Sequence, residues 1–233
     1  MTLRILRTTA ALWLALMAGC GSDSATGGNS GEYVSSSWHD DTVAHLLVKP
    51  TGEVSGYLLV MYGWVYEMTG SVSASGTLSL SVKDPVTQQP VPGTTSTGSC
   101  DGAGTCTGIT YAGPNQPFQY VLVRVTPQTN KFAGVYKVPL TLDDTTPVGT
   151  SWFGVDSNGK GYGFEEGLTV TNRTSIIGDV VPTSGDFTLT NTPLGSAEVA
   201  ISGKIGTDGL ISNGAWHTSL YSGKLSGSKL TPH

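Results

Sequence analysis

Residues 119–125 read QYVLVRV, with apolar side chains at every second position. Two further stretches follow the same pattern, TLSLSV at residues 77–82 and DFTLT at residues 186–190. Successive side chains of a β-strand point to opposite faces, so this alternation puts one face against a core and the other in water. The pattern predicts short, half-buried strands.

Turn signals separate these strands at short intervals: PTG at residues 50–52, SNG at 157–159, SG at 184–185 and DG at 208–209. Each offers Gly or Asn where a hairpin needs a positive φ angle. Glycine makes up 32 of the 233 residues, and Leu, Glu and Lys are few, which argues against helices. We therefore expect an all-β chain built as an antiparallel meander.

The densest apolar stretch is YLLVMYGWVYEM at residues 57–68. It is apolar on both alternating faces, so it predicts either two strands joined near Gly63 or one strand covered on both faces. It is too short to span a membrane.

An internal repeat organises the chain. GEY at residues 31–33 recurs as GVY at 134–136, and DDT at 40–42 recurs at 143–145. Further pairs follow in the same order at offsets of 105 to 109 residues: Val48 and Val155, Gly52 and Gly159, Gly56 and Gly163, Gly70 and Gly178, Gly76 and Gly185, Gly98 and Gly203, Gly108 and Gly214. The shared order indicates a duplication.

The duplication divides the chain into residues 31–126 and residues 131–233. Each half of about 100 residues can supply roughly eight short strands, enough for a small barrel or sandwich. We expect two tandem β repeats; the alternative is one large barrel shared by both halves.

The N-terminus has the layout of a secretory signal peptide. Arg4 and Arg7 precede the apolar run TTAALWLAL at residues 8–16, and MAG at residues 17–19 leads directly to Cys20. This arrangement resembles the lipobox of bacterial lipoproteins. The resemblance implies cleavage of residues 1–19, diacylglycerol on the Cys20 thiol and acylation of the new N-terminus. The alternative is a plain signal peptide or membrane anchor with an incidental cysteine.

Residues 20–30 then form a lipid anchor and a Gly-rich flexible linker. In lipoproteins of Gram-negative bacteria, an Asp directly after the cysteine is associated with retention in the inner membrane. Gly21 stands there instead, which favours the outer membrane if the organism has one. A lipidated cysteine, a tether and two small β domains resemble in layout the surface lipoproteins of Neisseria that bind host proteins.

Cys100 and Cys106 flank the Gly-rich segment DGAGT. Two cysteines across a hairpin turn can reach disulfide distance, and an exported protein meets an oxidising compartment. We expect a local disulfide; a redox-active pair is the alternative, but the usual C-x-x-C spacing is absent.

Candidate binding residues are few. His39 stands beside Asp40 and Asp41, directly after Trp38, and could hold a cation or orient a base. The equivalent place in the second half, residues 142–144, reads LDD and lacks a histidine, which favours turn-forming aspartates. Aromatic candidates belong either to the core or to a binding surface. Those candidates, with one neighbouring histidine, are Trp64, Trp152, Trp216 and His217.

The sequence indicates binding without catalysis. No nucleophile elbow, metalloprotease motif, phosphate-binding loop or dinucleotide fingerprint occurs, so we expect no enzyme, cofactor or metal. Without residues 1–19 the chain has 10 basic and 17 acidic residues, a formal charge of −7, which disfavours nucleic acid as a partner. We expect a lipid-anchored envelope protein that binds a protein, glycan or small ligand. The alternatives are a structural lipoprotein acting through assembly and, third, a hydrolase.

Overall fold

The computed structural model describes residues 28–37, 42–60, 63–112, 117–143, 145–167, 174–191 and 199–233. The lipobox with Cys20, most of the linker, and the cluster of Trp38, His39, Asp40 and Asp41 lie outside the described residues. None of the described residues belongs to a helix long and apolar enough to cross a membrane.

The first half is a closed antiparallel barrel in which each strand pairs with the next and β8 pairs with β1. Its strands are β1 (Gly31–Ser35), β2 (Thr42–Val48), β3 (Glu53–Val60), β4 (Trp64–Val72), β5 (Thr77–Lys83), β6 (Thr94–Cys100), β7 (Thr105–Ala112) and β8 (Pro117–Arg124).

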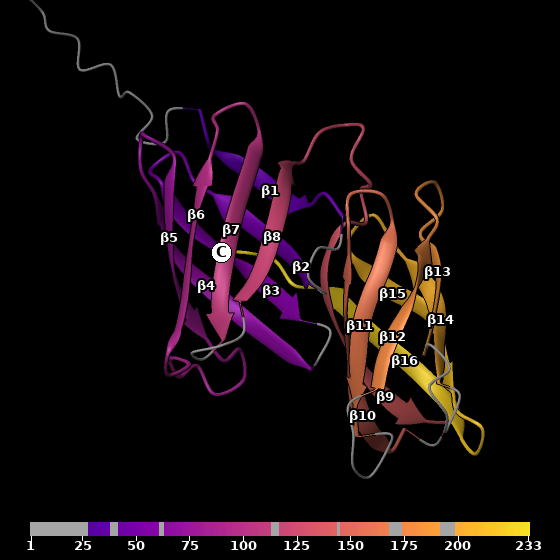
Figure 1. The fold of residues 1–233 in the computed structure, drawn as a ribbon. Helices are drawn as coiled ribbons and strands as arrows, with labels where there is room; N and C mark the ends of the chain where they lie inside the picture. Colours follow the sequence, from indigo (N-terminus) through magenta and orange to yellow (C-terminus); the bar gives the residue numbers. More distant parts are fainter. Residues whose placement is uncertain are drawn as a thin grey trace, which may run out of the picture.

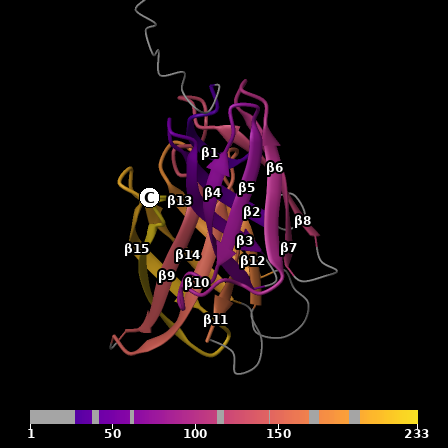
Figure 2. The same cartoon turned by 90° about the vertical axis from the view of Figure 1, so that its left-hand side faces the viewer.

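The second half repeats this meander, and β16 pairs with β9 to close it. Its strands are β9 (Gly134–Leu142), β10 (Pro147–Val155), β11 (Lys160–Glu166), β12 (Thr174–Val180), β13 (Asp186–Asn191), β14 (Ala200–Ile205), β15 (Leu210–His217) and β16 (Ser222–Lys229). Figure 1 shows the two barrels side by side, and in the turned view of Figure 2 the first barrel lies in front of the second. The prediction of an all-β chain with two tandem repeats is confirmed, and the alternative of one shared barrel is wrong.

The dense stretch at residues 57–68 is divided between β3 and β4, as the first of its two interpretations predicts. Gly63 between them has a φ of 103°, which favours glycine. The inward-facing side chains of β4 fill the first barrel, whereas its outward-facing Val65 is covered by the second barrel. Coverage on both faces explains why this stretch shows no alternation.

Side chains fill both barrel interiors. Leu58 and Met68 are fully buried in the first barrel, and the second buries Phe153, whose ring lies 5.0 Å from that of Tyr136. Close packing of this kind is typical of protein cores, where burial of one large apolar side chain contributes about 1.5–3 kcal/mol. The barrel interiors are therefore cores formed by the protein's own side chains.

The repeat holds at the level of single contacts. The Tyr33 hydroxyl donates to the Asn29 carbonyl at 2.9 Å, and the Tyr136 hydroxyl donates to the Phe132 carbonyl at 2.7 Å, each four residues back. Equivalent turn glycines share the same backbone geometry, with φ of 89° at Gly52 and 91° at Gly159. Matched residues in the sequence thus occupy matched places in the two barrels.

A disulfide joins Cys100 to Cys106, which pair directly across β6 and β7, so the predicted bridge is confirmed. Both cysteines are buried, and an inaccessible disulfide is poorly placed for the alternative redox role. The bridge therefore links the two adjacent strands of one hairpin, β6 and β7.

Replacing both cysteines with alanine is expected to lower the free energy of unfolding by about 2 kcal/mol, because the loop that the bridge closes is short. Urea denaturation of the oxidised wild type and the double variant measures the difference. Reduced wild type is the control and should resemble the variant. Equal stability of all three samples would contradict a stabilising role.

Candidate functional site

The two barrels meet through a third apolar cluster. Leu59 and Val65 of the first barrel pack against Val135, Trp152 and Phe164 of the second. All five are buried, although their side chains point outward from their own barrels. An apolar face covered in this way holds the barrels together.

Backbone and polar contacts strengthen the junction. The Ser157 amide donates to the Ser35 carbonyl at 2.8 Å, and the Ser157 hydroxyl donates to the Ser36 carbonyl at 2.9 Å. The segment after β16 leaves the second barrel and runs to the first, where the Ser55 hydroxyl donates to the His233 carbonyl (Figure 1).

A triad of titratable side chains lies in this junction. One carboxylate oxygen of Glu32, on β1, lies 2.7 Å from His45 Nε2 and 3.2 Å from Lys229 Nζ. In the strand register, Lys229 on β16 lies opposite Tyr136 on β9. Arg124 on β8 lies opposite Tyr33 on β1 in the same way, so the two cations occupy equivalent places. Arg124 donates within its own barrel, to the Tyr33 hydroxyl at 3.0 Å, whereas Lys229 crosses to the other barrel.

The triad fixes the protonation of its members. The hydrogen bond from His45, helped by Lys229, lowers the pKa of Glu32 to about 2. Burial lowers the pKa of His45, which is 1% exposed, so its imidazole is neutral at pH 7 and Nε2 carries the proton donated to Glu32. The nitrogen nearest the carboxylate is thus a donor, which suits a structural bridge better than a general base.

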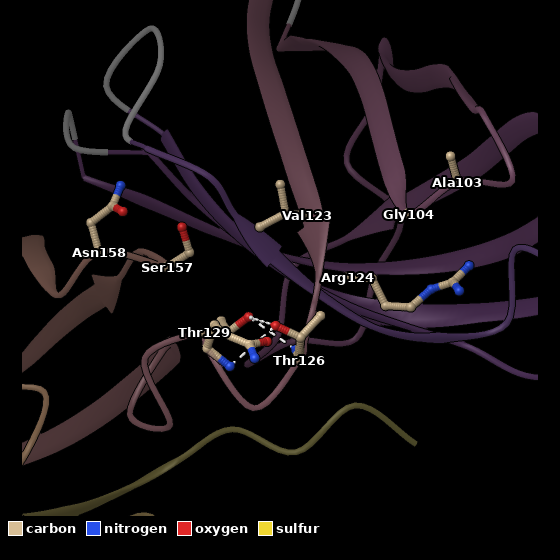
Figure 3. Close-up of a pocket in the computed structure, with 9 residues that line it drawn as sticks. Ala103, Gly104, Val123, Arg124, Thr126, Thr129, Ser157 and Asn158 are labelled. Atoms are coloured by element: carbon tan, nitrogen blue, oxygen red, sulfur yellow. Dashed lines mark hydrogen bonds between the residues drawn. The ribbon is translucent and has the colours of Figure 1, made fainter.

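A polar hollow of about 480 Å³ lies where the interbarrel linker meets both barrels (Figure 3). The Thr126 amide donates to the Thr129 hydroxyl at 3.0 Å, and the Arg124 side chain extends away from Ser157 and Asn158. The Arg124 guanidinium is already bonded to the Tyr33 hydroxyl and the Gly28 carbonyl. These polar groups are engaged with the protein itself.

A second hollow, which we call the junction cleft, has a volume of about 330 Å³ and is lined by Tyr57, Glu67, Lys137 and Trp152. Lys137 Nζ lies 5.0 Å from the centre of the Trp152 ring, close enough for a cation–π contact. Gln88 Nε2 donates to a Glu67 carboxylate oxygen at 2.8 Å. Burial, with the Glu67 charge, raises the pKa of Tyr57, so its hydroxyl remains a hydrogen-bond donor at pH 7.

The structure places the aromatic candidates in three different surroundings. Trp152 lines the junction cleft, and Trp64 stands at the rim of the first barrel, 38% exposed, with its ring 6.4 Å from that of Phe118. Trp216 is buried in the core of the second barrel, where its indole nitrogen donates to the Thr141 carbonyl at 2.9 Å. His217, the next residue along β15, is exposed.

Sequence reasoning missed the charged residues of the junction. Glu32 and Lys229 are 197 positions apart and touch only because the barrels pack against each other. It also missed Glu165, although the repeat carries a signal for it. The motif GY at residues 56–57 matches GF at residues 163–164, and the next residue is Leu58 in one half and Glu165 in the other.

Comparison with known proteins assigns no family. No family model matches the chain, and no curated protein matches it. A solved structure of the isotype 1 transferrin binding protein B from serogroup B Neisseria meningitidis is similar at a TM-score of 0.26 and 11% sequence identity. The match covers 82% of this chain, which spans about half (51%) of that one. The fold assignment therefore rests on strand pairing alone.

Proposed function

We propose that this protein is a lipid-anchored, non-catalytic binding protein of the cell envelope that holds its ligand in the junction cleft. The observation that carries the proposal is the filling of both barrels by their own side chains, which leaves the outer surface for ligands. Clefts between packed domains are frequent ligand sites. The cleft combines two aromatic rings, those of Tyr57 and Trp152, with one cation and one anion.

Closure of the barrels favours binding over the assembly alternative. A free edge strand offers unpaired backbone groups to another chain, and closed barrels have no free edge. Both barrels close through paired first and last strands. The lipid at Cys20 would then set the location, and the cleft would supply the activity.

The anchor has a direct test. In the Cys20→Ala variant, acylation is impossible, so the protein is expected to remain unprocessed or to leave the detergent-extracted membrane fraction. Fractionation followed by immunoblotting measures both outcomes. A variant that fractionates as the wild type does would contradict lipidation at Cys20.

The cleft is tested in the full chain, in cells, with a photo-crosslinking residue at position 88. We expect a discrete cross-linked product that disappears when Lys137→Glu reverses a charge of the cleft. The matched control carries the same residue at position 49, which lies outside the cleft, directly after β2. The same products from both positions, or none from position 88, would contradict binding in the cleft.

A further inference from the structure

The interior of the second barrel contains an unusual polar layer, formed by Ser151, Glu165 and Thr174. In the strand register Glu165 on β11 pairs with Ser151 on β10 and with Thr174 on β12. Phe153, two residues after Ser151, belongs to the core of this barrel. Side chains two residues apart on a strand share a face, so the polar layer points into the barrel.

The described residues of the first barrel form no polar layer at the equivalent place. The residues that pair across its strands as Ser151, Glu165 and Thr174 do in the second barrel are Ala44, Leu58 and Tyr66. All three are buried in the core of the first barrel. The duplication therefore provides an internal comparison for this position. In the second barrel, Ser151 takes the place of an alanine, Glu165 of a leucine and Thr174 of a tyrosine.

Glu165 is 0% exposed, and among the described residues neither of its carboxylate oxygens has a partner in hydrogen-bond geometry. Burial raises its pKa to about 7, although the Thr174 hydroxyl lies close enough to offset part of the rise. The facing residues, Ser151 from β10 and Thr174 from β12, carry no charge. No salt bridge joins Glu165 to a cation among the described residues. A buried carboxylate that no cation balances is costly and calls for a counter-charge.

We infer that the polar layer is a binding site for a small hard cation, with the Glu165 carboxylate and the hydroxyls of Ser151 and Thr174 as ligands. The donor set consists of oxygen atoms, which suits calcium or sodium and disfavours zinc or copper. The described residues hold no group of three His, Cys, Asp or Glu side chains around a common point. The site therefore has one formal negative charge, and water would complete the coordination.

A carboxylate binds a cation only after it has lost its proton. A proton and a cation therefore compete for the same two oxygens of Glu165, and cation binding is expected to weaken as the pH falls. This inference concerns the interior of the second barrel and is independent of the junction cleft.

The test is thermal unfolding of the full chain at pH 8 in choline chloride, whose cation is too large for the site. Calcium chloride or sodium chloride then replaces part of the choline at constant ionic strength. We expect the wild-type Tm to rise by about 3 °C when one of the two cations is present at about ten times its Kd. A response to calcium alone identifies a calcium site, and a response to sodium alone identifies a sodium site.

Glu165→Gln is the matched variant, because it keeps the shape of the side chain and removes the charge. It should unfold cooperatively and show no cation-dependent shift. Calorimetric titration of the wild type gives an independent readout and should show one ion per chain. Equal shifts in wild type and variant, or no response of the wild type to either cation at pH 8, would overturn the inference.

Discussion

Replacing Gly56 with alanine is expected to lower the free energy of unfolding by about 3 kcal/mol or more. A Cβ atom at this position would lie 2.1 Å from the His45 carbonyl oxygen and 2.8 Å from the Leu46 Cα. Both atoms belong to the backbone of the neighbouring strand, so the clash can be removed only if β2 moves away from β3. The equivalent Gly163 meets the Trp152 carbonyl at the same distance, and Gly163→Ala should be equally damaging.

The control is Gly93→Ala. A Cβ atom there has no other atom within 4 Å, but the residue has a φ of +72°, so the substitution costs only the backbone strain of about 1 kcal/mol. Urea denaturation followed by circular dichroism compares the three variants. Similar losses for Gly56→Ala and Gly93→Ala would show that the close approach of the strands is not the decisive factor.

Glu165→Leu is expected to raise the free energy of unfolding by about 3 kcal/mol at pH 8 in a buffer without small cations. The pKa of Glu165 is about 7 in the folded protein and 4.5 in the unfolded chain. As the pH rises from 4.5 to 7, the unfolded chain releases a proton that the folded protein retains, so wild-type stability falls. Leucine does not titrate, and the first barrel has a buried leucine, Leu58, at the equivalent position.

The measurement is the difference in unfolding free energy between this variant and the wild type from pH 4 to pH 8. The difference should increase through this range and level off above pH 7. His45 acts in the opposite direction, because its lowered pKa makes stability fall as the pH drops below 6.5, but this effect is common to both proteins. A difference that is constant with pH would contradict a buried, titrating Glu165.

Local signals predicted most of the fold. The alternation at residues 77–82 lies in β5, and the turn glycines Gly52 and Gly159 stand where a positive φ is required. The matched glycines Gly56 and Gly163 are required by strands that approach each other closely in both barrels. Such features depend on neighbours in the sequence or on direct strand pairing, so a single sequence reveals them.

Barrel closure and the junction could not be predicted in this way. Alternation is the same in a sandwich and in a barrel, since both bury one face of each strand. Trp152 and Trp216 stand in similar strand contexts, yet one faces the other barrel and the second lies in a core. The contact between Glu32 and Lys229 depends on how two complete barrels pack, which no local pattern records.

Closure also bears on how such a protein can arise. Because β1 pairs with β8, with Tyr33 opposite Arg124, the chain enters and leaves the first barrel at neighbouring points. The second barrel has the same arrangement, with Tyr136 opposite Lys229. A gene segment that encodes such a unit can be copied in tandem without changing how any strand is connected or paired. The same geometry would let circular permutation join the old ends with a short peptide and open new ones at a hairpin.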